Sequence, residues 1–283
     1  MTTHLHHVSS PPILVVGATG KTGRRVAERL IAANVPVRLA TRAGPVRFDW
    51  DDERTWAPAL TGSHAIYLTV APDLAVPGAA ELAGRFAELA ADSGVHRLVL
   101  LSGRGEPGAR AGEEAVQAAG VPWTIIRSAC FAQDFSESFL LDAVRNGVIM
   151  LPAGDVREPF IDAEDIADLA AAALTQPGHD GRLYEVTGPQ LLGFADAAAE
   201  LSVATGRQII YQPLSLTDYL AEGRRLGLGE ELLAVYSHLF TETLDGRNAW
   251  ISHGIQRGLR RSPRSFAAYA RRTAGTGVWQ VAA

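Results

Sequence analysis

Short runs of β-branched and aliphatic residues alternate with longer alanine-rich stretches between residues 13 and 188. The runs predict buried β-strands at 13–16, 35–41, 46–50, 65–70, 96–102, 123–127 and 182–187. The stretches between them predict helices, chiefly at 22–33, 77–93, 111–119 and 164–174. Strands that alternate with helices in this way are typical of an α/β fold with a doubly wound parallel sheet.

The alternation loosens after residue 128, and helices dominate after residue 189. Further helices are predicted at 131–146, 194–205, 216–225, 230–244 and 265–274, with extended segments at 148–151 and 208–211. We interpret 189–283 as a smaller, mostly helical C-terminal cap that binds substrate, with 131–160 partly in it. Residues 13–188 then form the sheet domain, and 1–12 are expected to form a flexible tail.

A tight glycine turn, Gly17-Ala18-Thr19-Gly20-Lys21-Thr22-Gly23, follows the first predicted strand. Gly17 allows a sharp turn off the strand, Gly20 allows the backbone to approach a pyrophosphate, and Gly23 allows close packing of helix on strand. The helix that starts there adds free N–H groups and the positive end of its dipole. Because the glycines lie between an apolar strand and a helix, they predict a Rossmann dinucleotide site.

Two alternatives concern the same turn. Gly20-Lys21-Thr22 resembles the end of the phosphate loop of nucleoside triphosphatases, but that motif requires a glycine five positions before Gly20, where Val15 stands inside the strand. The turn is therefore too short to wrap a triphosphate. The other alternative is a structural turn that binds no ligand.

The end of the second predicted strand indicates which nicotinamide cofactor is bound. An NAD site usually places Asp or Glu there to bind the ribose 2′-hydroxyl, and this chain has no acid between Glu28 and Asp49. Arg42 instead offers a guanidinium that can grip a 2′-phosphate, unless it is only a solvated loop residue. NADP(H) is therefore the predicted cofactor.

Other residues are expected at the cofactor because ligands of open α/β sheets lie at the carboxyl ends of the strands. The fourth predicted strand ends at Thr69-Val70-Ala71, and the fifth ends at Ser102. The segment Phe48-Asp49-Trp50 can flank the adenine, although Asp49 is equally well explained as a turn residue.

Composition narrows the classes of function. The chain has 283 residues, of which 47% are hydrophobic and 20% charged, as in a globular protein with a sizeable core. A net charge of −5 disfavours binding of nucleic acid, which needs a clustered basic face. No apolar run reaches the ~18 residues that cross a bilayer. One cysteine, Cys130, and no secretory signal favour the cytoplasm. His4, His6 and His7 stand in the tail without partner ligands, so no metal site is expected.

The chain resembles the NmrA-like group of atypical short-chain dehydrogenases, near relatives of the quinone, triphenylmethane-dye and isoflavone reductases. The resemblance covers nearly the whole chain and rests on Gly17-x-x-Gly20-x-x-Gly23, Gly120-Val121-Pro122-Trp123-Thr124-Ile125-Ile126-Arg127, Pro159-Phe160-Ile161-Asp162 with Asp165-Ile166-Ala167, Gly188-Pro189 and Pro263-Arg264-Ser265-Phe266. It implies that NADP(H) is bound, that a small C-terminal lobe caps the nicotinamide, and that Ala129, Cys130 and Phe131 lie beside that ring. The complete predicted cofactor site is Gly17, Thr19, Gly20, Lys21, Thr22, Gly23, Arg42, Asp49, Thr69, Val70, Ala71, Ser102, Cys130 and Phe131.

A classical short-chain dehydrogenase uses a tyrosine as acid, with a lysine four residues later that lowers its pKa. Lys21 is the only lysine and belongs to the glycine turn, so none of the six tyrosines has that partner. The interpretation we favour is an NADPH-dependent reductase that transfers hydride to a small apolar carbonyl, quinone or enone, with a proton from water, Ser102, a cap residue or the substrate. A non-catalytic NADP(H) sensor and a redox-neutral lyase or isomerase are the alternatives. The sequence identifies no catalytic residue, substrate or oligomeric state.

Four further polar residues have two interpretations each. Asp134, just past the expected nicotinamide turn, can be an acid of raised pKa, but a cap for the helix that begins there is favoured. Asp162 and Asp165 match family positions and are explained by capping and packing of the following helix. Cys130 can be a reactive thiol, but a small buried hydrophobe is the simpler interpretation.

Overall fold

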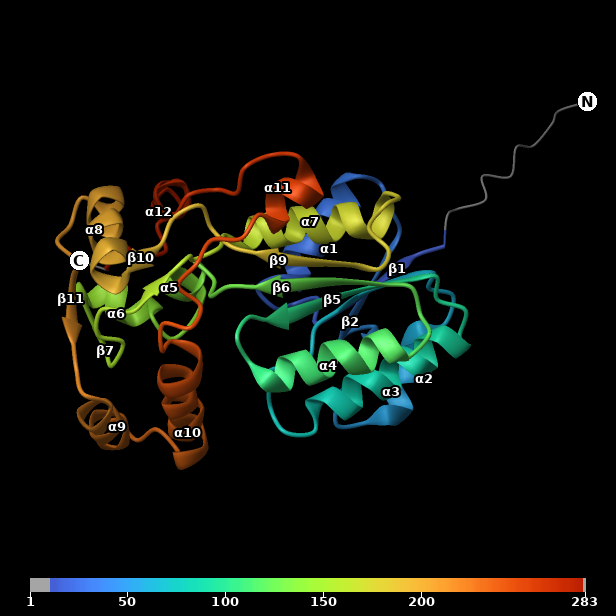
Figure 1. The fold of residues 1–283 in the computed structure, drawn as a ribbon, viewed down its shortest axis with the longest axis horizontal. Helices are drawn as coiled ribbons and strands as arrows, with labels where there is room; N and C mark the ends of the chain where they lie inside the picture. Colours follow the sequence, from blue (N-terminus) through green and yellow to red (C-terminus); the bar gives the residue numbers. More distant parts are fainter. Residues whose placement is uncertain (1–10, 282–283) are drawn as a thin grey trace, which may run out of the picture. The chain divides into compact units, whose positions relative to one another are not determined.

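A seven-stranded parallel sheet, in the order β3-β2-β1-β4-β5-β6-β9, forms the centre of the computed structural model, which describes residues 11–281 (Figure 1). The sheet confirms the predicted doubly wound α/β fold. The predicted tail, apart from its last two residues, and its three histidines lie outside the described residues. The strands of the sheet are β1 (Ile13–Val16), β2 (Val37–Thr41), β3 (Val46–Arg47), β4 (Ala65–Leu68), β5 (Arg97–Gly103), β6 (Trp123–Ser128) and β9 (Arg182–Val186).

The order of the strands reverses at β1, which pairs in parallel with β2 on one side and β4 on the other. Every residue of β1 and of β4 is buried, which is why both strands are continuous apolar runs in the sequence. In doubly wound sheets such a reversal leaves a crevice at the carboxyl ends of the two strands, and ligands bind there. The topology therefore favours a ligand site formed by the residues that follow Val16 and Leu68.

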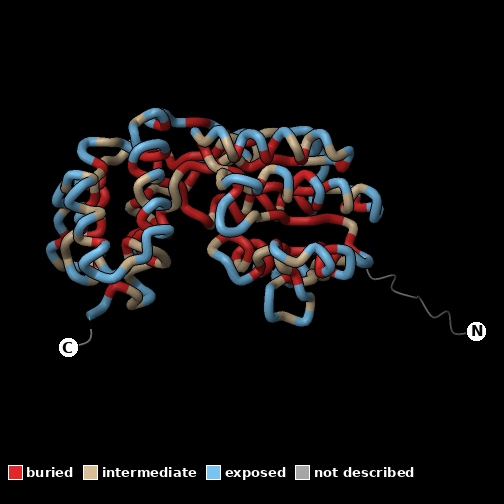
Figure 2. Tube along the Cα trace, turned by 90° about the horizontal axis from the view of Figure 1, so that it is seen from below, coloured by how far each residue is buried: buried red, intermediate tan, exposed pale blue. Residues whose placement is uncertain are grey.

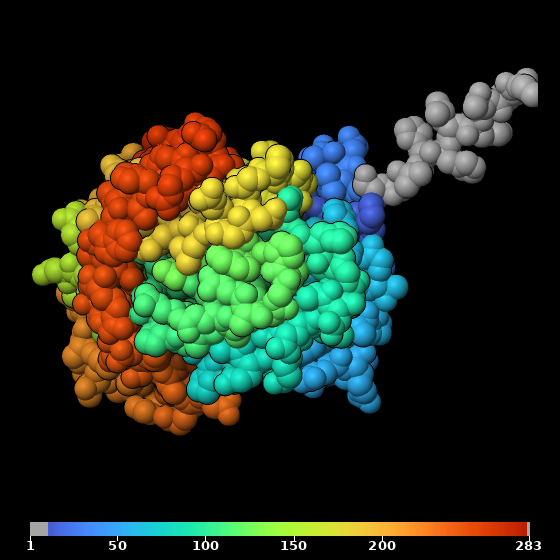
Figure 3. Space-filling model, turned by 45° about the vertical axis from the view of Figure 1, so that its right-hand side comes forward, coloured from blue at the N-terminus to red at the C-terminus, as the bar shows by residue number. Residues whose placement is uncertain are grey.

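Helices cover both faces of the sheet. On one face lie α1 (Gly23–Ala32) and α7 (Ala163–Thr175), which are joined by an ion pair of 2.5 Å between Arg29 and Asp168. The other face carries η1 (Glu53–Thr55), α2 (Trp56–Leu60), α3 (Ala79–Asp92) and α4 (Pro107–Ala118) (Figure 1). Helices α3 and α4 run side by side, as Figure 3 also shows, because Gly84 of α3 leaves room for Ala115 of α4.

The chain divides into two compact units, and unit 1 consists of Met1–Ser102, Gly108–Ile126 and Ala167–Leu183. Its core includes a cluster of four aromatic rings, Phe48, Trp50, Trp56 and Phe86, whose centroids lie 5.0–6.2 Å apart. Phe48 is 4% exposed and Trp50 is 8% exposed. The expectation that these two rings flank the adenine is corrected accordingly, since both belong to the core.

Unit 2 consists of Gly103–Pro107, Arg127–Ile166 and Tyr184–Ala283, and it has a hydrophobic core of its own (Figure 2). The division is thus discontinuous along the chain. The predicted substrate cap of residues 189–283, with 131–160 partly in it, stays a prediction. Strand β11 pairs in parallel with β7, and β10 pairs antiparallel with β8. The elements that lie mainly in unit 2 are α5 (Asp134–Glu137), α6 (Leu141–Asn146), β7 (Val148–Leu151), β8 (Arg157–Glu158), β10 (Leu192–Gly193), α8 (Phe194–Thr205), β11 (Ile210–Pro213), α9 (Leu216–Arg225), α10 (Glu230–His238), η2 (Leu239–Thr243), α11 (Gly254–Leu259) and α12 (Phe266–Ala274).

Two predicted helices of this unit are broken. The helix expected over 131–146 is interrupted between α5 and α6, where Ser138 has an extended backbone with φ −147° and ψ −158°. The helix expected over 230–244 changes at His238 into the wider turn η2. Among residues 11–281, no helix has the length and apolar character needed to cross a membrane.

Candidate cofactor site

The glycine turn after β1 is closely packed at two of its three glycines. Gly17 has a φ of +73°, and a Cβ atom there would lie 2.3 Å from Oγ1 of Thr69. A Cβ atom on Gly23 would lie 2.2 Å from the carbonyl oxygen of Gly17. The turn and the first residue of α1 therefore require glycine at both positions.

The third glycine, Gly20, lies on the open side of the turn. Thr19 and Gly20 are exposed, and a Cβ atom on Gly20 would approach only the Gly17 carbonyl oxygen, at 3.2 Å. Helix α1 has no acidic residue in its first turn, and its N-cap Thr22 makes no side-chain cap bond. An uncapped helix N-terminus beside an exposed glycine backbone suits an anionic group such as a pyrophosphate.

The ends of β1 and β4 are joined by Thr69. Its Oγ1 donates a hydrogen bond of 3.2 Å to the carbonyl of Val16, and its own carbonyl accepts one of 3.2 Å from Nε1 of Trp50. Thr69 and Val70 are half-buried and Ala71 is exposed. The structure thus brings the predicted residues after β4 next to the glycine turn, at the reversal of the sheet.

Arg42 follows β2 directly, and its side chain is exposed. Within residues 11–281 its guanidinium has neither a hydrogen bond nor an ion pair, so its donors are available to a ligand. Asp49 is held in a turn, where its Oδ1 accepts a hydrogen bond of 3.3 Å from the N–H of Asp51. This hydrogen bond gives Asp49 a structural role in the turn. Contact between Asp49 and a cofactor stays a prediction.

Ser102 is buried near the end of β5. Its Oγ donates a short hydrogen bond of 2.6 Å to Oε1 of Glu113, and both residues are at most 3% exposed. The hydroxyl proton is therefore held by a carboxylate inside unit 1. This arrangement argues against Ser102 as a proton source for a substrate, and its proximity to a cofactor stays a prediction.

The turn after β6 belongs to unit 2 and contains Cys130 and Phe131, both half-buried. The carbonyl of Cys130 accepts a hydrogen bond of 2.9 Å from the N–H of Ile161, and Phe131 forms a β-bridge with Ile161. Burial raises the pKa of the Cys130 thiol well above its usual value, and the charges of nearby acids raise it further. The thiol stays protonated, which supports the interpretation of Cys130 as a small hydrophobe.

Asp162 and Asp165 have structural roles, as expected. Oδ1 of Asp162 caps α7 by accepting the N–H of Glu164 at 3.0 Å, and its Oδ2 accepts a hydrogen bond of 2.6 Å from Arg272. Asp165 accepts the N–H of Arg264 at 2.7 Å and forms an ion pair of 2.7 Å with Arg261. These contacts confirm the interpretation by capping and packing.

Asp134 differs from its expected role. The N-cap of α5 is Gln133, which makes no side-chain cap bond, and Asp134 is the first residue inside the helix. The predicted capping by Asp134 is corrected to a negative charge in the first helical turn, where the dipole favours it. Gln133 instead caps α7, because its Oε1 accepts the N–H of Ala163 at 2.8 Å.

Sequence reasoning missed a buried ionic cluster in unit 2. The Nε of Arg104 donates to Oε1 of Glu185 at 2.6 Å, and its two other guanidinium nitrogens donate to the carbonyls of Asn248 and Trp250 at 3.1 Å each. The guanidinium also stacks 4.2 Å from the centre of the Trp250 ring. No sequence signal identifies these partners, because they stand 81 to 146 residues from Arg104.

A second missed residue is Glu158, at the end of β8. The residue is 0% exposed, and neither carboxylate oxygen has a hydrogen-bond partner among the described residues. Burial raises the pKa of Glu158 to about 7, although the positive charge of Arg104 partly opposes this shift. No pattern in the sequence around Arg157 and Pro159 indicates a buried acid, so the burial of Glu158 is a finding of the structure.

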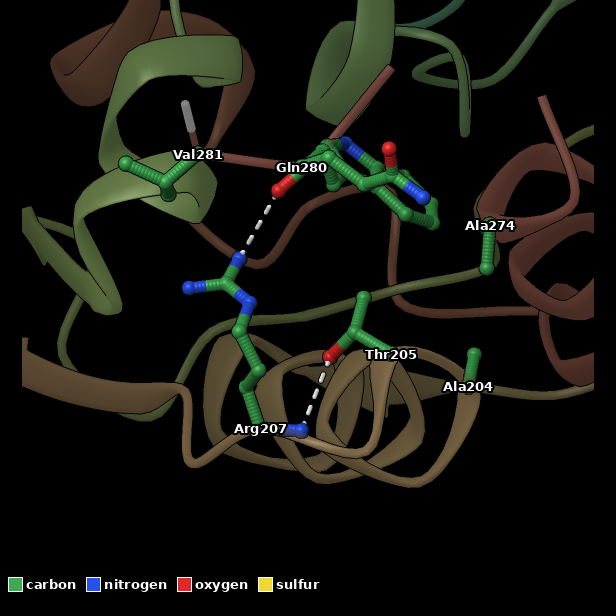
Figure 4. Close-up of a pocket in the computed structure, with 7 residues that line it drawn as sticks. Ala204, Thr205, Arg207, Ala274, Gln280 and Val281 are labelled. Carbon is green, nitrogen blue, oxygen red and sulfur yellow. Dashed lines mark hydrogen bonds between the residues drawn. The ribbon is translucent and has the colours of Figure 1, made fainter. Parts of the chain in front are cut away.

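One recess of about 340 Å³ lies in unit 2, lined by Ala204, Thr205, Arg207, Ala274, Trp279, Gln280 and Val281 (Figure 4). Arg207 is held there by main-chain carbonyls, those of Arg145 and Trp279 at 3.1 Å and that of Val144 at 3.2 Å. Its guanidinium therefore binds the end of α6 to the C-terminal segment. The recess includes none of the predicted cofactor residues, and we assign it a structural role.

The donor set after β1 and β2 fits a phosphorylated dinucleotide, because an open glycine backbone, an uncapped helix N-terminus and a free guanidinium are present together in unit 1. Comparison with known proteins agrees with this fit. Residues 17–177 match the NAD(P)H-binding family.

Two relatives and one solved structure illustrate the likeness. The NAD(P)H azoreductase of Xenophilus azovorans is 31% identical over 281 residues, which cover 92% of this chain and 96% of that protein. The (4-alkanoyl-5-oxo-2,5-dihydrofuran-3-yl)methyl phosphate reductase of Streptomyces griseus is 36% identical over 224 residues, 72% of this chain and 77% of that protein. The triphenylmethane reductase of Citrobacter sp., solved with NADP(H), shares the fold with a TM-score of 0.76 and 20% identity over 93% of this chain and 99% of that chain.

The match to the NAD(P)H-binding family covers more than half of the chain, and the azoreductase likeness extends over nearly all of it. The seven-stranded sheet and the glycine turn agree with both. The chain belongs to the NAD(P)H-binding family of oxidoreductases, and the solved triphenylmethane reductase shares its fold.

Proposed function

We propose that this protein is an NADPH-dependent reductase of small apolar acceptors whose reducible bond is conjugated with a carbonyl, such as quinones and enones. The observation that carries the proposal is the open glycine turn at the reversal of the sheet, where Gly20 and the N-terminus of α1 are available to a pyrophosphate. When bound, NADPH supplies the hydride. The residues of the chain bind it, orient it and exclude water.

A preference for NADPH over NADH follows from Arg42. Its free, exposed guanidinium after β2 suits a 2′-phosphate, which accepts two parallel hydrogen bonds from arginine. No acid stands between Glu28 and Asp49 to bind a free 2′-hydroxyl. We propose that five further residues complete the cofactor site: Thr69, Val70, Ala71, Cys130 and Phe131.

The acceptor class rests on chemistry and on the relatives. The chain lacks a tyrosine with a lysine four residues later, so it is suited to acceptors that take hydride without strong activation by an acid. The two relatives above are named for reduction of an azo bond and of a dihydrofuranone that carries an alkanoyl group. We infer a conjugated, electron-poor acceptor for this chain too.

Unit 2 supplies apolar surface that suits such an acceptor. Phe139, Tyr219 and Tyr236 are half-buried, and their rings lie next to one another, with centroids 5.6 Å apart for Phe139 and Tyr236 and 6.0 Å apart for Tyr219 and Tyr236. Half-buried aromatic rings are typical of pockets for small apolar ligands. We propose that these three rings contact the acceptor.

The test is oxidation of NADPH by the purified protein with a panel of quinones, enones, ketones and azo dyes. Turnover of at least one conjugated acceptor, with none for saturated ketones of similar size, supports the proposal. Tight binding of NADPH without turnover of any acceptor overturns it and favours a sensor of NADP(H). Conversion of an acceptor without consumption of NADPH favours a redox-neutral lyase or isomerase.

A further inference from the structure

Glu158 is a carboxylic acid in an environment that suits the neutral form. Both of its oxygens are buried without a hydrogen-bond partner in residues 11–281, and the residue as a whole is 0% exposed. A buried charge without a partner is destabilising, and an apolar side chain of similar size would be more stable in the same place. An acid kept at such a position is therefore a candidate for a chemical role.

The position of Glu158 relates it to the turn after β6. Three residues after Glu158, Ile161 donates its N–H to the carbonyl of Cys130 and forms a bridge with Phe131. The charge of Glu158 is also the nearby charge that most raises the pKa of the Cys130 thiol. The carboxyl therefore lies beside the turn at the carboxyl end of β6, the end of a parallel strand where ligands of this fold class bind.

Charged groups from several segments surround this position. The positive charge of Arg104, after β5, lowers the pKa of Glu158, and the negative charge of Asp245, after η2, raises it. The charges of Asp134, Glu106 and Glu158 together raise the pKa of Cys130. Arg104 does not neutralise Glu158 by a hydrogen bond, because its donors are bound to Glu185 and to two main-chain carbonyls. Burial raises the pKa of Glu158 to about 7 in spite of the opposing charge of Arg104, and the charge of Asp245 adds to the rise, so the carboxyl is mostly protonated below that pH.

We propose, on the basis of the reductase function above, that Glu158 is the proton donor of this enzyme and replaces the missing tyrosine. Reduction adds a hydride from NADPH to a carbon of the acceptor, and the conjugated carbonyl oxygen takes up the electron pair of the broken double bond. The O–H bond of Glu158 then breaks, its proton adds to that oxygen, and NADP⁺ is released. The Glu158 carboxylate regains a proton from water before the next turnover.

The experiment compares Glu158→Gln with the wild type on two acceptors. A quinone needs a hydride and a proton, whereas a cationic triphenylmethane dye needs only a hydride to become neutral. Glutamine keeps the size of the side chain and removes the acid. We expect the ratio of quinone to dye turnover to fall about 100-fold in Glu158→Gln, as is typical when a general acid is lost. Glu231→Gln, on the exposed start of α10, is the matched control and should keep the wild-type ratio.

Two further readouts separate acid chemistry from a structural role. In the wild type, quinone turnover should decline as the pH rises through about 7, and Glu158→Gln should lack this decline. Carbon NMR of the protein labelled at glutamate carboxyls, recorded without cofactor or substrate, should show one carboxyl that titrates near pH 7 in the wild type and is missing in Glu158→Gln.

Each outcome supports or overturns the proposal. A wild-type protein that oxidises NADPH with no quinone and no enone overturns the reductase function and, with it, the role of Glu158. If only an enone is turned over, that enone takes the place of the quinone in the comparison. Turnover of quinone with an unchanged ratio and pH profile in Glu158→Gln overturns only the role of Glu158. Equal loss with both acceptors overturns the proton donor as well and indicates a structural residue. If the dye is not turned over, the decline above pH 7 and its loss in Glu158→Gln decide the question.

Discussion

A Cβ atom on Gly23 would lie 2.2 Å from the carbonyl oxygen of Gly17, so the first residue of α1 rests directly on the turn that precedes it. Gly23→Ala must therefore push α1 away from β1 or distort the turn. We expect a loss of about 1–3 kcal/mol in the free energy of unfolding, the usual range for overpacking. Urea denaturation followed by circular dichroism measures it. A stability equal to that of the wild type contradicts this packing.

The variant Gly20→Val changes the exposed glycine of the same turn. The nearest atom to a Cβ atom on Gly20 is the Gly17 carbonyl oxygen at 3.2 Å, so the variant is expected to fold. The branched side chain would occupy the space that a pyrophosphate needs, and binding of NADPH should be abolished. Fluorescence titration with NADPH tests this, with the circular dichroism spectrum as control. A folded variant with wild-type affinity would place the phosphate site elsewhere.

Arg42→Ala should remove the preference for NADPH. The wild type is expected to bind NADPH at least tenfold more tightly than NADH, which corresponds to about 1.4 kcal/mol from the arginine–phosphate contact. Titration of both cofactors measures the ratio, which should approach one in the variant. Arg182→Ala is the control, because Arg182 is also exposed but stands at the amino end of β9. Equal affinities of the wild type for the two cofactors would refute the role of Arg42.

Glu158 should make the stability of the protein depend on pH. Its pKa is raised from 4.5 to about 7, so the folded state keeps a proton that the unfolded state releases between these values. The free energy of unfolding therefore falls as the pH rises from about 4.5 to about 7. Glu158→Gln should lack this fall and be more stable than the wild type at pH 8 by up to about 3 kcal/mol.

Urea denaturation at several pH values between 5 and 8 measures this difference, and Glu231→Gln should follow the wild-type curve. Parallel curves for the wild type and Glu158→Gln would show that Glu158 titrates in its ordinary range.

Cys130 should react slowly with alkylating agents. Burial and the neighbouring acids raise the pKa of the thiol, and the thiolate is the reactive form. We expect alkylation by iodoacetamide at pH 8 to be at least about tenfold slower in the folded protein than for a free cysteine. Because Cys130 is the only cysteine, mass spectrometry reads the reaction directly. Rapid reaction without denaturant would instead support a reactive thiol.

The sheet and the glycine turn could be predicted because their signals are local. The apolar runs 13–16 and 65–68 form buried strands, as their residue pattern predicts. Gly20 and Gly23 are constrained by the Gly17 carbonyl oxygen a few residues away, whereas Gly17 depends on its own φ of +73° and on Thr69. The free guanidinium of Arg42 was also accessible from sequence, since no acid stands near it.

The polar interior of unit 2 could not be predicted, because it depends on contacts between distant parts of the chain. Arg104 meets Glu185 across 81 residues, and Gln133 meets Asp162 across 29. The burial of Glu158 and the break at Ser138 likewise depend on tertiary packing, which periodicity does not report. The proposed proton donor therefore emerged only from the structure.

Transfer of deuterium is the most direct test of the proposed reductase. NADPH deuterated at the hydride position is incubated with the protein and a quinone or enone, and the product is examined by mass spectrometry and NMR. With an enone, we expect deuterium on a carbon of the product. With a quinone, we expect NADP⁺ to form in step with quinone consumption, while the deuterium exchanges into water. No NADPH oxidation above the rate without protein, across the whole panel and despite tight cofactor binding, would contradict it.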